Sequence, residues 1–344
     1  MGRVTIMDVA RAAGVSKGAA SHALNDMPGV SAETRARVKA AAQELHWSPN
    51  STARALSGAK AGAIGWAIVR TSKSPSIDPY FMELFAGIEL ELAGTDLALV
   101  VKLVADRAEE EALYRRWAAE RRVDGVLTMD IDLDEQRFDL LSGLGLPFAA
   151  FRSYAGSRPP EDGFASVWSD ESAPVAAVLD PAFARGHRRI AWVSGDARML
   201  SIGLRTEAAE SWARERGAAV ETTFTDFSRE AGSEAVRRIL RSPEPPTCVV
   251  FDNDLMALAG LGAIRELGLE VPRDVSVLSW IDSALCEVSR PEIAALRHPT
   301  TEFGRLLTRR LLGVLESGER GDLILPPLQF VDRGSLGDVP QSLD

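Results

Sequence analysis

Apolar residues recur at helical spacing in the first 48 residues, which predicts three short helices there. Each helix would turn one face of small or branched apolar side chains inward. In chain order these positions are Ile6, Val9, Ala10 and Ala13, then Ala20, Ala23 and Leu24, then Val38, Ala41, Ala42 and Leu45. Together the three faces can close a small core of their own.

Residues that begin and end helices stand at the borders of these segments. Thr5 and Asp8 have the spacing of a helix start, where side chains reach unpaired backbone N–H groups. Ser16 and Ser31 can cap the second and third helices. Gly14 ends the first helix and permits a tight turn. The pattern therefore predicts a helix-turn-helix followed by a third helix.

The second helix is apolar on one side and polar on the other. In a helix-turn-helix, this helix enters the major groove of DNA and reads the edges of the bases. We expect DNA contacts from its polar side and from residues that begin helices. These candidates are Thr5, Ser16, Lys17, Gly18, Ser21, His22 and Asn25.

Residues 49–61 are predicted to form a hinge helix and linker. Pro49 ends the third helix, and Asn50 can cap a short fourth helix. Two interpretations of the apolar residues remain open. In the first, Leu56 inserts between base pairs in the minor groove; in the second, Ala53 and Leu56 pack on the following domain. In the first interpretation the DNA contacts are Asn50, Ala53, Arg54 and Leu56.

From residue 62 the pattern changes to strands alternating with helices. Strand-like apolar runs lie at 63–69, 97–101, 125–128, 147–151, 189–193, 248–251 and 275–279, and helices are expected near 80–92 and 109–119. This repetition predicts an α/β core of parallel sheets with helices on both faces. Two sets of strands, divided near 163–167, indicate two Rossmann-like lobes with a cleft between them.

Charge separates the two parts of the chain. The 344 residues contain 39 Lys and Arg against 49 Asp and Glu, a net charge of −10. Residues 1–61 hold eight basic and four acidic residues, so they carry +4 and the remainder carries −14. A basic head on an acidic body confines attraction for phosphate to one end.

A specific series of positions runs through the head and the hinge. It consists of Val4-Thr5-Ile6-x-Asp8-Val9-Ala10, Ala13-Gly14-Val15-Ser16, Pro28-Gly29-Val30-Ser31, Pro49-Asn50 and Ala53-Arg54-x-Leu56. This series resembles the LacI/GalR family of bacterial repressors, and the resemblance extends over nearly the whole chain. It implies a homodimer whose hinge helices pair in a palindromic operator, with a periplasmic-binding-protein-like effector core. His22 stands where the family usually has Arg, which changes the expected base preference.

Polar and aromatic residues follow the predicted strands, where ligands bind in parallel sheets. With the family resemblance, they define the candidate effector site: Asp78, Tyr80, Phe81, Arg152, Asp170, Ser201, Arg205, Asn253, Asp254, Trp280 and Asp282. Aromatic platforms with amides, carboxylates and Arg suit a carbohydrate. Without the resemblance, Asp170 and Asp254 are equally well helix caps, and Trp280 is equally well a core residue. Arg205 is then equally well a surface charge.

One position of this site departs from the family pattern. The family usually has an Asp directly after the aromatic residue of its last strand, whereas this chain has Ile281, with Asp282 one residue later. Neighbouring strand residues face opposite ways, so Asp282 needs a local bend to take that role. A sugar or glycoside is the expected effector, and a nucleobase is the alternative.

Other functional classes find little support. The chain has no G-x-S-x-G, P-loop, H-E-x-x-H or strand-linked G-x-G-x-x-G motif, so we expect no enzyme and no cofactor. Its histidines, His22, His46, His187 and His298, are scattered, which predicts no metal site. Cys248 and Cys286 lie in apolar segments and are expected to be reduced core residues. Without a signal peptide or membrane-length apolar run, a cytoplasmic protein is expected.

The sequence thus predicts a DNA-binding transcriptional regulator, most simply a repressor, that binds a palindromic operator as a homodimer and answers to a small-molecule effector. The expected domains are a helix-turn-helix head (1–48), a hinge helix and linker (49–61) and a two-lobed effector-binding and dimerisation core (62–344). A sugar-binding receptor without a DNA role is the alternative from another class. The attached head argues against that alternative.

Overall fold

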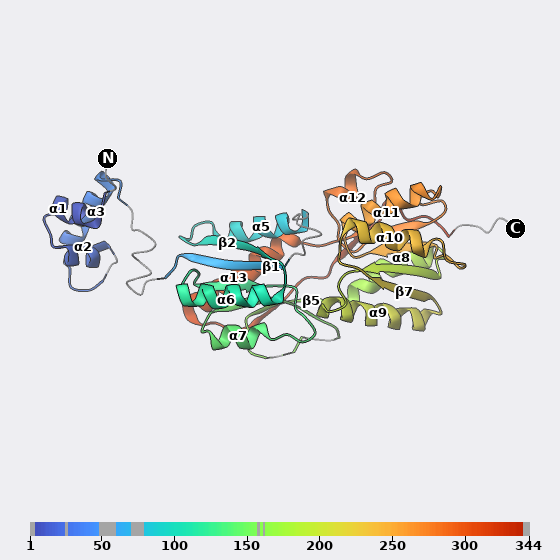
Figure 1. The fold of residues 1–344 in the computed structure, drawn as a ribbon, viewed down its shortest axis with the longest axis horizontal. Coiled ribbons are helices and arrows are strands. Elements are labelled where there is room, and N and C mark those ends of the chain that lie inside the picture. Colours follow the sequence, from blue (N-terminus) through green and yellow to red (C-terminus); the bar gives the residue numbers. More distant parts are fainter. Residues whose placement is uncertain are drawn as a thin grey trace. The chain divides into compact units, whose positions relative to one another are not determined.

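The computed structural model describes residues 4–24, 27–47, 60–69, 79–156, 159–160 and 162–339. Residues 1–62 and 63–344 form two compact units, and each has its own core (Figure 1). Within the described residues, no helix is long and apolar enough to cross a membrane.

The first unit is the predicted three-helix head. Its helices are α1 (Ile6–Ala13), α2 (Lys17–Leu24) and α3 (Ala32–Glu44). They bury a core made mostly of alanines, namely Val9, Ala10, Ala13, Ala20, Ala23, Val38, Ala41 and Ala42. Alanine side chains are small, so three short helices can approach closely enough to exclude water from one small core.

The predicted helix starts of the head are confirmed. The backbone N–H of Thr5 donates to Oδ2 of Asp8 over 2.9 Å, and the Thr5 hydroxyl donates to the same oxygen over 2.7 Å. Ser16 accepts from the backbone N–H of Ala19 over 3.1 Å, and Ser31 caps α3 in the same way. Gly14 has a φ of +66°, the left-handed conformation that the turn between α1 and α2 requires.

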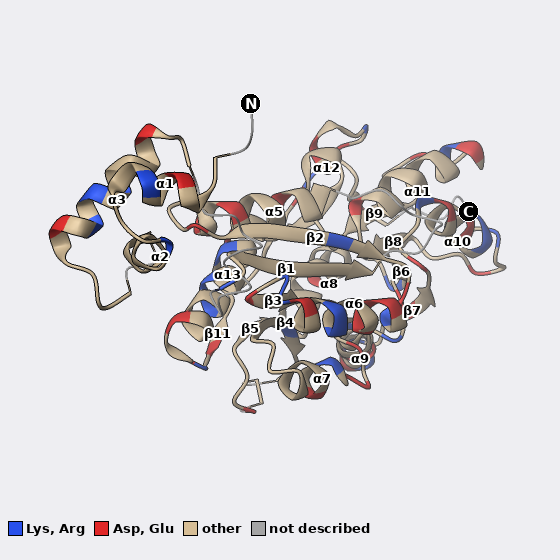
Figure 2. Ribbon diagram, turned by 60° about the vertical axis from the view of Figure 1, so that its left-hand side comes forward, with Lys and Arg blue, Asp and Glu red and all other residues tan. Residues whose placement is uncertain are grey.

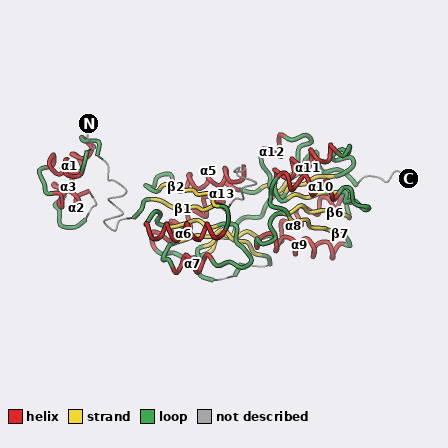
Figure 3. The backbone as a smooth tube through the Cα atoms, viewed as in Figure 1, coloured by secondary structure: helices red, strands yellow, loops and turns green. Residues whose placement is uncertain are grey.

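The second unit contains two six-stranded sheets with helices on both faces (Figures 1 and 3). The first sheet has the order β11-β5-β4-β3-β1-β2, and all its strand pairs are parallel. Its strands are β1 (Ala63–Val69), β2 (Ala98–Val104), β3 (Gly125–Thr128), β4 (Phe148–Tyr154), β5 (Ser166–Asp170) and β11 (Asp322–Ile324). Helices α5 (Pro79–Leu92) and α13 (Thr300–Ser317) cover one face, and α6 (Arg107–Glu120) and α7 (Arg137–Gly143) cover the other.

The second sheet repeats this order as β12-β10-β9-β8-β6-β7. Its strands are β6 (Arg189–Ser194), β7 (Ala219–Phe224), β8 (Cys248–Phe251), β9 (Ser276–Ser279), β10 (Ala294–Arg297) and β12 (Gln329–Val331), which pairs antiparallel to β10. Helices α8 (Ala173–Ala184) and α9 (Leu200–Arg216) cover one face. The other face carries α10 (Arg229–Ile239), α11 (Asp254–Glu266) and α12 (Ala284–Val288). Cys248 and Cys286 are free and buried, as predicted.

Three backbone segments connect the two sheets (Figure 3). The chain passes from β5 to α8, from β10 to α13 and from β11 to β12. The predicted division near 163–167 is therefore wrong in detail, because β5 continues the first sheet to Asp170. Each lobe is discontinuous in sequence, and the connecting segments lie beside the carboxyl ends of the parallel strands.

Helices α5 and α13 pack closely against each other. A side-chain carbon on Gly87 of α5 would lie 1.9 Å from the carbonyl oxygen of Thr301 in α13. One on Gly304 of α13 would lie 2.3 Å from the carbonyl oxygen of Leu84. Because no side chain separates the two backbones, the first turns of α5 and α13 are fixed relative to each other. Those turns carry Phe81 and Phe303, which belong to the site described below.

Candidate functional site

The polar side of α2 forms a possible contact surface on the head. Lys17, Gly18 and His22 are exposed, and Ser21 is half-buried on the same helix. Ser16 and Thr5 are exposed at the starts of α2 and α1. The remaining predicted DNA contacts lie outside the described residues; they are Asn25, Asn50, Ala53, Arg54 and Leu56.

Basic residues lie on all three helices of the head. Arg11 lies in the last turn of α1, Lys17 begins α2, and α3 carries Arg35, Arg37 and Lys39 (Figure 2). Arg37 also has a structural role, because its Nε donates to the carbonyl oxygen of Ala13 over 3.0 Å. The head therefore combines a rigid helix pair with cationic groups that can meet a phosphate backbone.

A cavity of about 330 Å³ lies at the carboxyl ends of the strands of both sheets. Seven of the predicted effector residues line it: Tyr80, Phe81, Ser201, Arg205, Asn253, Asp254 and Trp280. Parallel strands present their carboxyl ends at one edge, and here the two edges face each other within one unit. Asp78 lies outside the described residues.

Aromatic rings form part of the cavity wall. Phe151 from β4 stacks on Phe303 from α13, with ring centroids 5.5 Å apart. Trp280, directly after β9, is 2% exposed and lies next to the ring of His298, with centroids 6.2 Å apart. Phe151 is the half-buried ring of this group and can contact a ring-shaped ligand, whereas Trp280 and Phe303 are buried behind it.

Arg205 of α9 is the centre of a buried ion-pair network. One terminal nitrogen of its guanidinium lies 2.7 Å from Oδ1 of Asp252, and the other lies 2.8 Å from Oε2 of Glu171. The guanidinium carbon lies 4.0 Å from the ring centroid of Trp280. Burial alone would lower the pKa of Arg205, but the two carboxylates raise it above its ordinary value.

Both partner carboxylates have further donors. Asp252, at the end of β8, accepts from Nε1 of Trp192 over 2.9 Å and from the backbone N–H of Gly195 over 2.8 Å. Glu171, in the segment that leaves the first sheet, accepts from the Ser153 hydroxyl over 2.9 Å. Arg205 therefore ties the second sheet to a connecting segment. Sequence reasoning selected Arg205 but missed both carboxylates.

Asn253 and Asp254 have structural partners at the start of α11. Oδ1 of Asn253 accepts from the backbone N–H of Met256 over 2.7 Å, so Asn253 caps the helix. Asp254 accepts from the backbone N–H of Leu255 over 2.7 Å and from the Ser283 hydroxyl. Burial raises the pKa of Asp254, although these hydrogen bonds oppose the shift.

Three predicted effector residues do not line the cavity. Asp282 is bound by Arg333 over 2.7 Å and by Arg297, so the bend that would turn it inward is absent. Ile281 lines the cavity instead, next to Trp280; both residues follow β9, which ends at Ser279.

Arg152 and Asp170 are likewise engaged elsewhere. Arg152 is paired with Asp162 and lies 4.1 Å from the ring centroid of Trp168, which buries its cation against an aromatic face. Asp170 accepts from the backbone N–H of Ser172 over 2.8 Å and from the Ser172 hydroxyl over 2.7 Å. Asp170 thus fixes the turn into α8, which was the cap interpretation of this residue.

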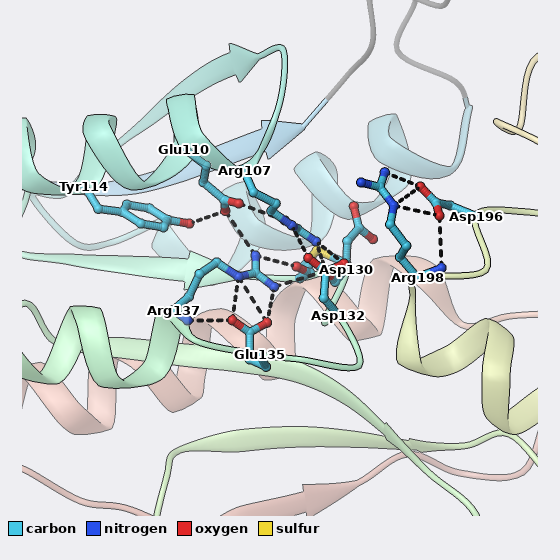
Figure 4. A network of polar contacts seen from close by, with 10 residues as sticks. Arg107, Glu110, Tyr114, Asp130, Asp132, Glu135, Arg137, Asp196 and Arg198 are labelled. Carbon is cyan, nitrogen blue, oxygen red and sulfur yellow. Dashed lines mark hydrogen bonds and ion pairs between the residues drawn. The ribbon is translucent and has the colours of Figure 1, made fainter.

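A charged network near the cavity mouth was also missed (Figure 4). Arg107 pairs with Asp132 over 2.7 Å and with Glu110 over 2.8 Å, and Arg137 pairs with Glu110 over 3.1 Å. The loop after β3 that carries Asp132 reaches the other lobe. The backbone N–H of Leu133 donates to the carbonyl oxygen of Arg198 over 2.9 Å. A wider use of the strand-end rule would have found Asp130, Asp132 and Asp196.

His298 lies in the segment that connects β10 to α13. Its Nε2 donates to the carbonyl oxygen of Trp280 over 2.8 Å, and its ring is also 6.2 Å from that of Phe303. Burial lowers the pKa of His298 to about 4, so the ring is neutral at pH 7. The partly accessible ring lines the cavity between the two lobes.

Comparison with known proteins agrees with both units. Residues 5–50 match the family of bacterial regulatory proteins called the lacI family, and residues 180–336 match a periplasmic binding protein-like domain. The transcriptional regulator AglR of Rhizobium meliloti (strain 1021) is 30% identical, with 98% of this chain and 95% of AglR covered.

Two solved structures extend the comparison. The transcriptional regulator CelR in complex with cellobiose is 27% identical, with a TM-score of 0.71 and coverage of 97% of this chain and all of CelR. The Lac repressor dimer bound to operator and an anti-inducer shares the fold, with a TM-score of 0.81 at 24% identity. The alignment covers 98% of this chain and the whole repressor chain.

A helix-turn-helix head joined to two parallel-sheet lobes defines a DNA-binding transcriptional regulator rather than an enzyme. The chain belongs to the LacI family of bacterial regulatory proteins.

Arg205→Ala should reduce the free energy of unfolding by about 3–5 kcal/mol, because it leaves two buried carboxylates without their cation. Arg214→Ala on the same helix is the matched control. The Arg214 side chain is 71% exposed and 3.9 Å from Glu210, so its loss should cost less than about 1 kcal/mol. Urea unfolding measures both, and equal small losses would show that Arg205 does not hold the network together.

His298 should make the protein less stable in acid. Its pKa is about 4 in the folded chain and about 6.5 when unfolded, so the unfolded chain binds more protons between these values. Stability should therefore fall as the pH drops from 6.5 to 4, by about 1–3 kcal/mol from this residue. His298→Gln keeps an N–H donor but does not titrate. Urea unfolding across this pH range should show a shallower decline for the variant; parallel curves would contradict the assignment.

Proposed function

We propose that this protein is a repressor that binds a palindromic operator as a homodimer, and that a small carbohydrate in the cavity sets its operator affinity. The observation that carries the proposal is the cavity itself, because residues from both lobes and from a connecting segment line it. A ligand there contacts every part that must move if the lobes change their arrangement. A protein acting on chromosomal DNA in this way works in the cytoplasm.

The head supports the DNA half of the proposal. Lys17, Gly18 and His22 are exposed along one helix that begins with a capped turn. Such a helix can enter the major groove, with its N-terminal residues at the base edges. The similar Lac repressor was solved as a dimer on its operator.

The homodimer is supported by the similar Lac repressor, which was solved as a dimer. Exposed apolar side chains of the core are candidate positions for the interface with a second copy. They include Met82 and Leu90 of α5, Leu103 of the edge strand β2, Leu258 of α11 and Val288 of α12.

The cavity lining supports a carbohydrate effector. Tyr80 and Phe151 are half-buried and supply aromatic rings, and the surrounding carboxylates accept hydrogen bonds from hydroxyl groups. The similar regulator CelR was solved with cellobiose. A nucleobase would use the aromatic faces but few of the carboxylates, since a base offers few donors.

Linkage provides the mechanism. An effector that binds one lobe arrangement better than the other shifts the population toward that arrangement. If only one arrangement lets the two heads and hinges of a dimer engage both half-sites, operator affinity changes with effector concentration. Release or retention of the operator follows from which arrangement the effector prefers.

Operator binding should depend steeply on salt. A dimer that neutralises about 6–10 phosphates should lose roughly 10³–10⁵ in affinity between 50 and 200 mM salt. Lys17→Ala should reduce the salt slope by about 2 per dimer, because each protomer loses one phosphate contact. Arg116→Ala, an exposed cation on α6 of the core, should leave the slope unchanged.

Fluorescence anisotropy on a palindrome selected from random DNA provides the measurement. A flat salt response, or equal affinity for the selected and scrambled duplexes, would rule out sequence-specific operator binding.

A further inference from the structure

Acidic side chains outnumber basic ones in the cavity. Eight carboxylates line it: Asp106, Asp130, Asp132, Glu171, Asp196, Asp226, Asp252 and Asp254. Three arginines line it: Arg107, Arg198 and Arg205. With His298 neutral, the described lining carries a formal charge of −5.

Each of the three arginines is already paired with a carboxylate of the same lining. Arg107 lies 2.7 Å from Asp132, and Arg205 lies 2.7 Å from Asp252. Nε of Arg198 donates to Oδ1 of Asp196 over 3.0 Å (Figure 4). Among the described lining residues, no cation remains to balance a phosphate or carboxylate on a ligand. An anionic effector would therefore enter a cavity that repels it.

Asp254 is buried without a cation. It is 2% exposed, and its hydrogen bonds come from neutral donors, the Ser283 hydroxyl and the backbone N–H of Leu255. Burial and the nearby Asp282 both raise its pKa. A carboxylate in this position gains more from a cationic ligand than one in water, because the surroundings screen the interaction less.

Asp130 presents a second carboxylate without a cation, and this one is half-buried. Its φ of +53° is uncommon for a residue other than glycine. Two hydrogen bonds to the carbonyl oxygen of Asp130 hold this conformation. Arg107 donates one, and Arg137 donates the other over 3.0 Å (Figure 4). Within the described part of the chain, its carboxylate has no hydrogen bond or ion pair. The backbone is fixed while the acid lines the cavity, as expected for a ligand contact.

Arg205 adds a requirement for a hydrogen-bond acceptor on the ligand. Its two terminal nitrogens are bound to carboxylates, but its buried Nε has no hydrogen-bond partner among the described residues. A ligand with a hydroxyl or ring oxygen can accept from that N–H. Together with the half-buried rings of Tyr80 and Phe151, the lining favours a ring-shaped ligand that carries both acceptors and a positive charge.

We infer that the effector is a cationic carbohydrate, an amino sugar or a glycoside with a free amine. Its ammonium group would lie near Asp130, while its ring would lie on the aromatic wall. This inference rests on the proposed function, since it names the ligand class of the same cavity.

Thermal unfolding of the full-length protein tests the charge requirement. The probes are glucosamine, galactosamine, mannosamine and the glucosamine disaccharide, each with its N-acetylated, unaminated and 6-phosphorylated counterparts. At least one amine should raise the melting temperature saturably, with an affinity at least tenfold above its neutral counterparts, and no phosphate should bind. Higher salt should weaken the amine but not a neutral sugar. An equal or tighter neutral sugar, a bound phosphate, or no response to any amine would overturn the inference.

A matched pair of variants places the ammonium group. Asp130→Asn should weaken the amine at least tenfold and leave a neutral sugar unchanged. Asp134→Asn, an equal loss of charge at an exposed position of the same loop outside the cavity, should leave the amine affinity within twofold. Equal effects of the two variants would contradict the assignment.

Operator titration separates the two proposals. A neutral sugar that binds and changes operator affinity would overturn the inference but keep the proposed function. An amine that binds without changing operator affinity would keep the inference about the ligand class but overturn the proposed function.

Discussion

The buried pairing of Arg205 with Asp252 and Glu171 joins the elements that a ligand must influence. Asp252 ends a central strand of the second sheet, and Glu171 lies where the chain leaves the first sheet. Both carboxylates are buried, and each is paired with the guanidinium at hydrogen-bond distance, so removal of the arginine would leave two buried acids without their cation.

The proposed function requires two lobe arrangements, and the contacts around this pair are the ones that would differ between them. Three connecting segments lie beside the cavity, and one of them holds His298 between Trp280 and Phe303. Across the mouth, the loops after β3 and β6 meet through backbone hydrogen bonds such as Leu133 to Arg198. Bonds of this kind can break and form as units, which gives a ligand discrete states to select. The excess of carboxylates then decides which ligands can do so.

Much of the fold could be predicted from the sequence, because local signals mark it. The helix caps of the head and the central apolar strands need no knowledge of distant residues. Five strands were not predicted: β5, β7, β10, β11 and β12. Of the edge strands among them, β7 is partly polar, and β11 and β12 are three residues each. Such strands form because a sheet edge is already there to pair with.

The position of the cavity could be predicted from the sequence, but the pairing of its charged residues could not. The strand-end rule and the family pattern together selected Arg205, Asn253 and Trp280. The partners of Asp282 could not be read from the sequence, because Arg333 is 51 residues away and lies after β12. The same applies to Arg205 and Glu171, which are 34 residues apart. Long-range pairing decides which charged residues face a ligand and which stabilise the fold.

Coupling between cavity and operator is the central claim, and reciprocal titration tests it most directly. A ligand found by thermal unfolding is added at saturation while the full-length protein is titrated onto its operator, and the ligand is then titrated with and without operator DNA. The ligand should change operator affinity by about 5–150-fold, and the operator should change ligand affinity by the same factor. Unchanged operator affinity at saturating ligand would contradict the claim.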